Sequence, residues 1–124
     1  WGRMPMPTKT DRVEQGIYRA QWIGYVTIED VFEARDNIDQ LAEADGCTKF
    51  IVFIDGTETK TLPFDLRMLT KANNENALAN LVLNAPYAGE VMGRMFNKFS
   101  PVQAEFFRDR DTLMQRAREL LATT

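Results

Sequence analysis

One short segment places a carboxylate where a reactive group is often found. Asp55–Thr57 directly follows an apolar run. An aspartate at the end of a buried strand can act as a nucleophile or as an acceptor of a phosphoryl group. Both chemistries need a second acidic residue nearby. Phe53 stands two positions earlier, where a paired aspartate would be needed, and Ile17–Val26 supplies no acid in its place. We therefore interpret Asp55–Thr57 as a strand end followed by a turn.

Other combinations of catalytic or metal-binding residues are missing from the sequence. The chain of 124 residues has no histidine and a single cysteine, Cys47. Ser-His-Asp and Cys-His catalytic sets are thereby excluded, and the usual zinc and non-haem iron sites are disfavoured. Glu29, Asp30 and Glu33 gather on one turn of an expected helix, but with Arg35 close by they are better interpreted as a solvated polar face. The sequence predicts a protein that is not an enzyme and holds no metal or cofactor.

Composition narrows the classes of partner. Hydrophobic residues make up 44% and charged residues 27% of the chain, as in ordinary globular domains. The net charge is −3 and the basic residues are mixed with acidic ones, so no dense basic surface for a nucleic acid is expected. No apolar run approaches the roughly 20 residues of a membrane-spanning helix. The single cysteine suits a reducing compartment. We predict a cytoplasmic protein with no nucleic-acid partner and no integral membrane association.

A hairpin and a long helix are expected first. Thr8–Gln15 is predicted as an edge strand, and Ile17–Val26 alternates apolar and polar residues with the period of a half-buried strand. Thr27 can cap the helix that follows, whose apolar residues recur at helical spacing. Gly46 is expected to end this helix.

Strands and helices then alternate to the end of the chain. Lys49–Asp55 contains five consecutive apolar residues, which is typical of a central strand covered on both faces. The remaining expected elements are a helix over Pro63–Ala72, a strand over Leu78–Leu83, a helix over Ala88–Phe99, a strand over Val102–Phe107 and a helix capped by Asp109 or Asp111.

The full order, ββαβαβαβα, defines the expected fold class. It predicts an α/β domain with a mostly parallel sheet, one antiparallel edge and helices packed on the sheet. Since no linker or repeat is found, we expect one domain over residues 8–124. Residues 1–7 form a lead, and because Met4 follows Trp1–Arg3 we expect the natural start to lie at Met4.

This order, together with three sequence motifs, resembles the STAS domains, the small regulatory fold of bacterial anti-sigma-factor antagonists. The motifs are Trp22–Asp30, Phe53–Thr57 and Phe106–Asp109. The resemblance extends over nearly the whole chain. It implies a STAS-like regulatory domain that acts by binding a protein partner.

The resemblance also implies a place for partner binding. In the family, a Ser or Thr at the start of the helix after the central strand is phosphorylated, and the added charge abolishes docking. The family pattern Asp-Ser-Ser/Thr-Gly is replaced here by Thr61–Asp65. Thr59 and Thr61 are the nearest substitutes, and turn or capping hydroxyls are the alternative interpretation. The candidate partner-binding residues are Asp55, Gly56, Thr57, Thr59, Thr61, Pro63 and Phe64.

An alternative function is the binding of a small apolar, lipid-like ligand between the third helix and the sheet. Met and Phe side chains suit adaptable contacts, so the candidate ligand contacts are Met92, Met95, Phe96 and Phe99, most of which are expected in the core. Gly89 and Gly93 are expected to let this helix approach the sheet closely. A homodimer through a sheet edge or through this helix is also compatible with the sequence.

Overall fold

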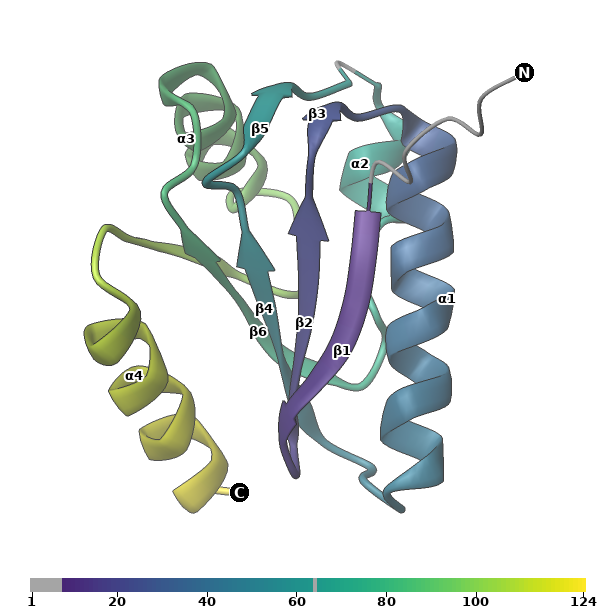
Figure 1. Ribbon diagram of the computed structural model, residues 1–124, viewed down its shortest axis with the longest axis vertical. Helices are drawn as coiled ribbons and strands as arrows, with labels where there is room; N and C mark the ends of the chain where they lie inside the picture. The colour runs from purple at the N-terminus through teal and green to yellow at the C-terminus, as the bar shows by residue number, and fades with distance from the viewer. Residues whose placement is uncertain (1–7, 64) are drawn as a thin grey trace.

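The computed structural model describes residues 8–63 and 65–124 (Figure 1). The strands are β1 (Thr8–Glu14), β2 (Ile17–Trp22), β3 (Gly24–Tyr25), β4 (Phe50–Asp55), β5 (Thr59–Thr61), β6 (Ala77–Leu83) and β7 (Ala104–Phe107). The helices are α1 (Ile28–Ala44), α2 (Arg67–Thr70), α3 (Tyr87–Phe96) and α4 (Arg110–Ala122). No helix in these two ranges has an apolar stretch long enough to cross a membrane.

The main sheet has five strands in the order β1-β2-β4-β6-β7. β1 pairs antiparallel with β2, and the other neighbours pair parallel. This arrangement confirms the predicted α/β class with a mostly parallel sheet and one antiparallel edge. Two parallel strands are joined by a helical crossover, so each helix must lie on a face of the sheet.

β4 lies at the centre of the sheet and is covered on both sides. Phe50 and Val52 face the cluster formed with α1, whereas Ile51 and Phe53 face the cluster formed with α4. Successive side chains of a strand point to opposite faces. An uninterrupted apolar run is therefore what a strand in this position requires, as the sequence predicted.

Helix α1 begins and ends where expected. The hydroxyl of Thr27 accepts a hydrogen bond from the Asp30 backbone N–H, and the Asp30 carboxylate accepts one from the Thr27 N–H, so both satisfy free helix N–H groups. Gly46 follows the helix with φ +71°, the left-handed conformation that commonly ends helices. The buried residues of α1 share one face, which packs over β1 and β2 and against side chains of β4: they are Ile28, Val31, Ala34, Ile38 and Ala42.

Helix α4 covers the opposite face of the sheet (Figure 1). Leu113 and Ala117 are fully buried against β4 and β6. Asp109 caps the helix by accepting from the Thr112 backbone N–H, which settles the choice between Asp109 and Asp111. Arg118 bonds Glu14 at 2.8 Å, so the end of the chain lies beside the β1–β2 hairpin.

The structure differs from the expected elements at the strand that ends in residue 26. β2 stops at Trp22, and Gly24, with φ +69°, redirects the chain so that β3 pairs with β5 in a separate two-stranded sheet. The Gly24 N–H donates to the carbonyl of Glu58, and the Val26 N–H donates to that of Thr61. The prediction of one continuous strand over Ile17–Val26 was therefore wrong, and β5 was missed.

The second and third helices are shorter than predicted. The carboxylate of Asp65 accepts from the backbone N–H and the guanidinium of Arg67, so α2 begins only at Arg67 and Pro63 lies outside it. α3 ends at Phe96, which leaves Phe99 beyond the helix. β7 likewise begins at Ala104 and not at Val102.

The hydroxyl of Tyr18 joins the hairpin to the end of α1. Tyr18 is fully buried, its hydroxyl donates to the Asp45 carboxylate at 2.7 Å, and it accepts from the Gly16 N–H at 3.3 Å. Arg12 donates to the same carboxylate oxygen at 2.8 Å. Burial, aided by hydrogen bonds with Cys47 and Asp45, raises the pKa of Tyr18 above its ordinary value. The hydroxyl therefore stays protonated and acts as a donor.

Replacing this hydroxyl should destabilise the fold. Tyr18→Phe keeps the ring but leaves the Gly16 N–H and one Asp45 lone pair without their partner, so we expect a loss of about 1–2 kcal/mol in the free energy of unfolding. Urea denaturation followed by circular dichroism measures it. The matched control is Tyr25→Phe, since Tyr25 is 70% exposed and should lose nothing. Equal effects of the two variants would contradict this account.

The same cluster predicts a dependence of stability on pH. Hydrogen bonds from Tyr18, and then from Arg12, lower the pKa of Asp45 below its ordinary 3.8. A carboxyl with a lowered pKa in the folded state stabilises above its unfolded pKa, and this contribution is lost as the pH falls through the lowered value. The wild type should therefore exceed Asp45→Asn in stability at neutral pH. The difference should shrink as the pH falls below 3.8, as thermal unfolding over a pH series would reveal; a constant difference would refute this assignment.

Candidate functional site

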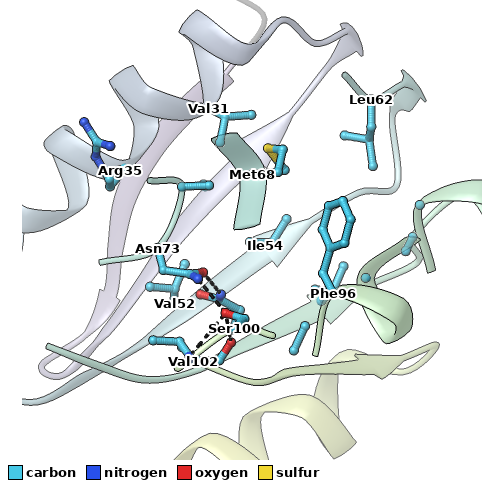
Figure 2. A pocket seen from close by; sticks show the side chains of 18 of the residues that line it. Val31, Arg35, Val52, Ile54, Leu62, Met68, Asn73, Phe96, Ser100 and Val102 are labelled. Atoms are coloured by element: carbon cyan, nitrogen blue, oxygen red, sulfur yellow. Dashed lines mark hydrogen bonds between the residues drawn. The ribbon is translucent and has the colours of Figure 1, made fainter. Parts of the chain in front are cut away.

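A cavity of about 120 Å³ lies between the α1-covered face of the sheet and the helices (Figure 2). Its walls come from β2, β4, β6 and β7 of the sheet and from α1, α2 and α3. Most of the lining is apolar. The apolar side chains labelled in Figure 2 are Val31, Val52, Ile54, Leu62, Met68, Phe96 and Val102.

Neutral polar side chains occupy one end of this cavity (Figure 2). The Asn80 side-chain N–H donates to Oδ1 of Asn73 at 2.8 Å, and Asn73 Nδ2 donates to the hydroxyl of Ser100 at 2.7 Å. The Ser100 hydroxyl in turn donates to the carbonyl of Val102 at 2.8 Å. This polar chain, Asn80–Asn73–Ser100, ties strand β6 to the loops before β6 and after α3. All three of its residues line the cavity.

The predicted ligand contacts divide between two faces of α3. Met92 is buried and Phe96 half-buried, and both line the cavity. Met95 and Phe99 are instead 52% and 73% exposed, so the prediction that most of this stripe belongs to the core was wrong. Helix α3 ends at Phe96, so Phe99 does not continue its inward face, and Met95 lies about 100° around the helix axis from its neighbour Phe96.

The outward residues form an apolar surface that we call the α3 stripe. It combines exposed apolar residues of α3 with one residue after the helix and one before α2. They are Tyr87, Val91 and Met95 of α3, Phe99 and Leu66, all more than 40% exposed. A shallow groove lined by Leu66 and by α3 residues runs between the two segments. Contiguous exposed apolar surface of this kind is uncommon in monomeric proteins and often marks an interaction site.

The predicted partner-binding loop lies beside α3, but several of its polar groups hold the loop itself. The Asp55 carboxylate accepts from the Thr57 N–H, and the Thr59 hydroxyl donates to the carbonyl of Trp22 at 2.9 Å. The Gly56 N–H donates to the carbonyl of Leu83. Thr59 is thus engaged in joining β5 to the end of β2, a long-range contact and not the turn or capping bond expected from the sequence.

The rest of the predicted loop residues have fewer contacts. Thr61 is exposed and pairs with Tyr25 through the β3–β5 ladder, and Pro63 is half-buried. The Thr57 hydroxyl accepts from Asn84 at 3.1 Å. Phe64 lies outside the described residues.

Two glycines bring α3 close to its neighbours, as the sequence predicted. A Cβ at Gly89 would lie 2.6 Å from Cδ1 of Leu62, and a Cβ at Gly93 would lie 2.5 Å from Cζ of Phe106 in β7. These contacts set the distance of α3 from the sheet, and with it the size of the cavity. They also place the start of α3 beside the loop that carries Leu62.

Paired charged groups lie beside the α3 stripe, and one of them, Asp65, lines the edge of its groove. Glu90 forms ion pairs with Arg94 at 3.4 Å and with Arg108 at 3.5 Å. Arg67 pairs with Asp65 at 2.6 Å, and its hydrogen bonds lower the pKa of the Asp65 carboxyl. Exposed pairs of this kind contribute little stability. They leave the stripe as an apolar area with a charged rim.

The sequence analysis did not predict the polar chain Asn80–Asn73–Ser100. It also did not predict that Leu66 and Tyr87 belong to the α3 stripe. Asn73, Asn80 and Ser100 are distant in sequence, and only the fold brings them together. One signal was visible: Asn80 interrupts the apolar segment Ala77–Leu83, and a polar side chain within such a segment, here half-buried, calls for hydrogen-bond partners. Leu66 and Tyr87 gave no comparable signal, because isolated exposed apolar residues are common.

The fold is shared with two solved structures. An uncharacterized protein of the DUF3478 family with a SpoIIAA-like fold, from Shewanella loihica PV-4, is similar with a TM-score of 0.62 and 22% sequence identity, over 89% of this chain and 91% of that one. The anti-sigma factor antagonist SpoIIAA in its unphosphorylated form is similar with a TM-score of 0.60 and 10% identity, over 90% of this chain and 97% of that one. Neither a protein-family profile nor a curated protein sequence matches this chain.

The close approach of α3 can be tested at its glycines. Gly93→Ala should destabilise the fold by roughly 1–3 kcal/mol, because the stiff ring of Phe106 must move, and this outweighs the gain in helix propensity of at most about 1 kcal/mol. Gly89→Ala meets only the flexible end of Leu62 and should change stability much less. Chemical denaturation of both variants decides; a stabilised Gly93→Ala would contradict the packing described here.

Proposed function

We propose that this chain, which has the SpoIIAA-like fold of STAS domains, is a non-catalytic regulatory domain spanning residues 8–124 that binds a protein partner in the cytoplasm. The observation that carries the proposal is the α3 stripe. An apolar surface surrounded by charged groups is the usual anatomy of a protein interface, with an apolar centre and a polar rim. The role of SpoIIAA as an anti-sigma factor antagonist lends support from the same fold.

The docking surface combines the stripe with the loop predicted from the sequence. Leu62 contacts the Gly89 position of α3, so the end of the loop Gly56–Pro63 and the start of α3 are neighbours. Tyr87 is 80% exposed and Leu66 is 79% exposed beside this junction. Aromatic side chains are enriched among the residues that dominate binding energy at interfaces. The partner is therefore expected to cover Tyr87 together with Met95.

Phosphorylation is not the expected switch for this docking. The Asp-Ser-Ser/Thr-Gly motif is absent, and the hydroxyl of Thr59 already bonds the Trp22 carbonyl. Regulation should therefore act through the availability of the partner or through the cavity behind α3.

The test is photo-crosslinking in the source cells. A photoreactive residue at Met95 should yield one protein adduct that is absent when the residue is placed at Gln115, an exposed position of α4. The purified partner should then bind the Met95→Glu variant at least about tenfold more weakly than the wild type, because the variant lacks one interface anchor. The same affinity for Gln115→Glu as for the wild type is the control.

Other outcomes of this experiment are informative. An adduct between two copies of the chain would mean that the α3 stripe binds a second copy of this protein and not a different partner. Equal adducts at both positions, or a partner whose affinity is unaffected by Met95→Glu, would overturn docking through the α3 stripe.

A second candidate function is the binding of a small ligand, favoured by the cavity between α3 and the sheet. Met92 and Phe96, two of the four ligand contacts expected from the sequence, line it, whereas Met95 and Phe99 do not. Its volume of about 120 Å³ is smaller than the roughly 300–1,000 Å³ of common ligand pockets. A lipid chain therefore does not fit without outward movement of α3, whereas a smaller molecule does.

A further inference from the structure

We infer that the cavity behind α3 binds a small neutral molecule with a ring-sized apolar body and one hydroxyl group, such as a phenol. The inference rests on the second candidate function and specifies its ligand class. Three observations support the inference. They are the size of the cavity, which bears on the apolar body, the polar chain at one end, which bears on the hydroxyl, and the charge of the lining, which bears on the neutrality of the ligand.

The volume sets the size of the apolar body. The cavity of about 120 Å³ is close to the ~150 Å³ of an engineered apolar cavity that takes up benzene. Its side walls are the aliphatic and aromatic groups of Val52, Ile54, Met92 and Phe96. These four side chains offer dispersion contacts to a ring but no hydrogen bond, whereas the indole N–H of Trp22 in the same lining is a free donor in the described part of the chain.

The polar chain sets the position of the hydroxyl. Within it, the Ser100 hydroxyl is fully used, since it accepts from Asn73 and from the Val102 N–H and donates to the Val102 carbonyl. Asn80 begins the chain and uses one N–H on Asn73. Its Oδ1 receives no hydrogen bond from the described residues. Asn80 is half-buried and lines the cavity, so a ligand hydroxyl can donate to this oxygen.

The charge of the lining excludes an anionic head group. Arg35 is the single ionisable residue among the described residues that line the cavity. Its guanidinium donates to the Asp36 carboxylate and to the carbonyl of Lys71, and it stacks over the ring of Phe32 at 4.9 Å. No uncompensated cation therefore remains for a carboxylate, and a buried charge without a partner is strongly disfavoured.

Trp22 provides the readout. It lines the cavity, is 9% exposed, and its indole N–H has no hydrogen-bond partner in the described part of the chain. Because the chain contains two tryptophans, Trp1 and Trp22, the substitution Trp1→Phe leaves Trp22 as the sole indole. Binding of a ligand in the cavity should change the fluorescence emission of Trp22.

The experiment compares phenol, benzene and benzoate, three probes that share a ring and differ in the polar group. Titrations of the full chain are followed by Trp22 emission and by heteronuclear NMR shifts. Phenol is expected to bind with a Kd of about 0.1–1 mM, a typical strength for so few heavy atoms. Benzene should bind about tenfold more weakly for want of one hydrogen bond. Benzoate should not bind.

Two variants test the site, with one matched control. Asn80→Ala removes the acceptor, so phenol should bind this variant no more tightly than benzene does. A variant that was only destabilised would still bind phenol more tightly than benzene. Ala20→Ile fills space from the floor of the sheet and should abolish binding of both. The control is Asn76→Ala, an exposed residue just before β6 that should leave the titrations unchanged.

The possible outcomes distinguish an error in the proposed ligand class from an error in the proposed binding site. Benzene and phenol of equal affinity in the wild type would overturn the hydroxyl assignment and leave the cavity as a ligand site. Binding of benzoate would overturn the neutral class. If neither ring binds at about 10 mM, or if Ala20→Ile leaves binding intact, the cavity is not the site and the second candidate function fails with it.

Discussion

Every other element of the structure depends on the burial of β4 from both sides. Phe50 and Val52 require a cover on one face and Ile51 and Phe53 on the other, and a strand buried in this way must also have its backbone groups paired on both edges. β2 and β6 provide that pairing. The helices then follow from the parallel connections, because a crossover has to pass over one face or the other. The fold can thus be understood as the set of elements that a single strand of five apolar residues needs around it.

The two faces of the sheet are covered to different degrees. On the α4 side, Leu113, Ala117, Ile51, Phe53 and Leu81 have no exposed surface. On the α1 side, the long helix covers β2 and part of β4, and the remainder is left to the short helix α2 and to α3, which is fixed through Gly89 and Gly93. The cavity lies where this composite cover is incomplete. Helix α3 consequently has two apolar faces: Met92 and Phe96 face the cavity, whereas the α3 stripe faces outward.

The sequence predicted those parts of the fold that are determined by residues within a single segment. The apolar run of β4, the Thr27 cap and Gly46 stop of α1, and the Asp109 cap of α4 are local signals, and the structure confirms all of them. β3 and β5 could not be predicted, because strands of two and three residues have no periodicity and exist only through pairing across a loop. For the same reason Asn73, Asn80 and Ser100 emerge as a unit only in three dimensions. Most of Met92, Met95, Phe96 and Phe99 were expected in the core, because these residues look like one apolar helix face when the end of the helix and its neighbours are unknown.

The position of α4 in the chain has a consequence for synthesis in the cell. A polypeptide emerges from the ribosome from its N-terminus, and domains fold as their segments become available. β1, β2, α1, β4 and β6 can assemble while residues 110–122 are still being made, so the face formed by Ile17, Ile51, Phe53 and Leu81 stays open to water until the last helix arrives. A nascent chain in this state would present an apolar sheet to other chains, the kind of transiently exposed surface that makes folding intermediates prone to aggregate. Closure comes when α4 settles on that face and Arg118 reaches Glu14 on the first strand.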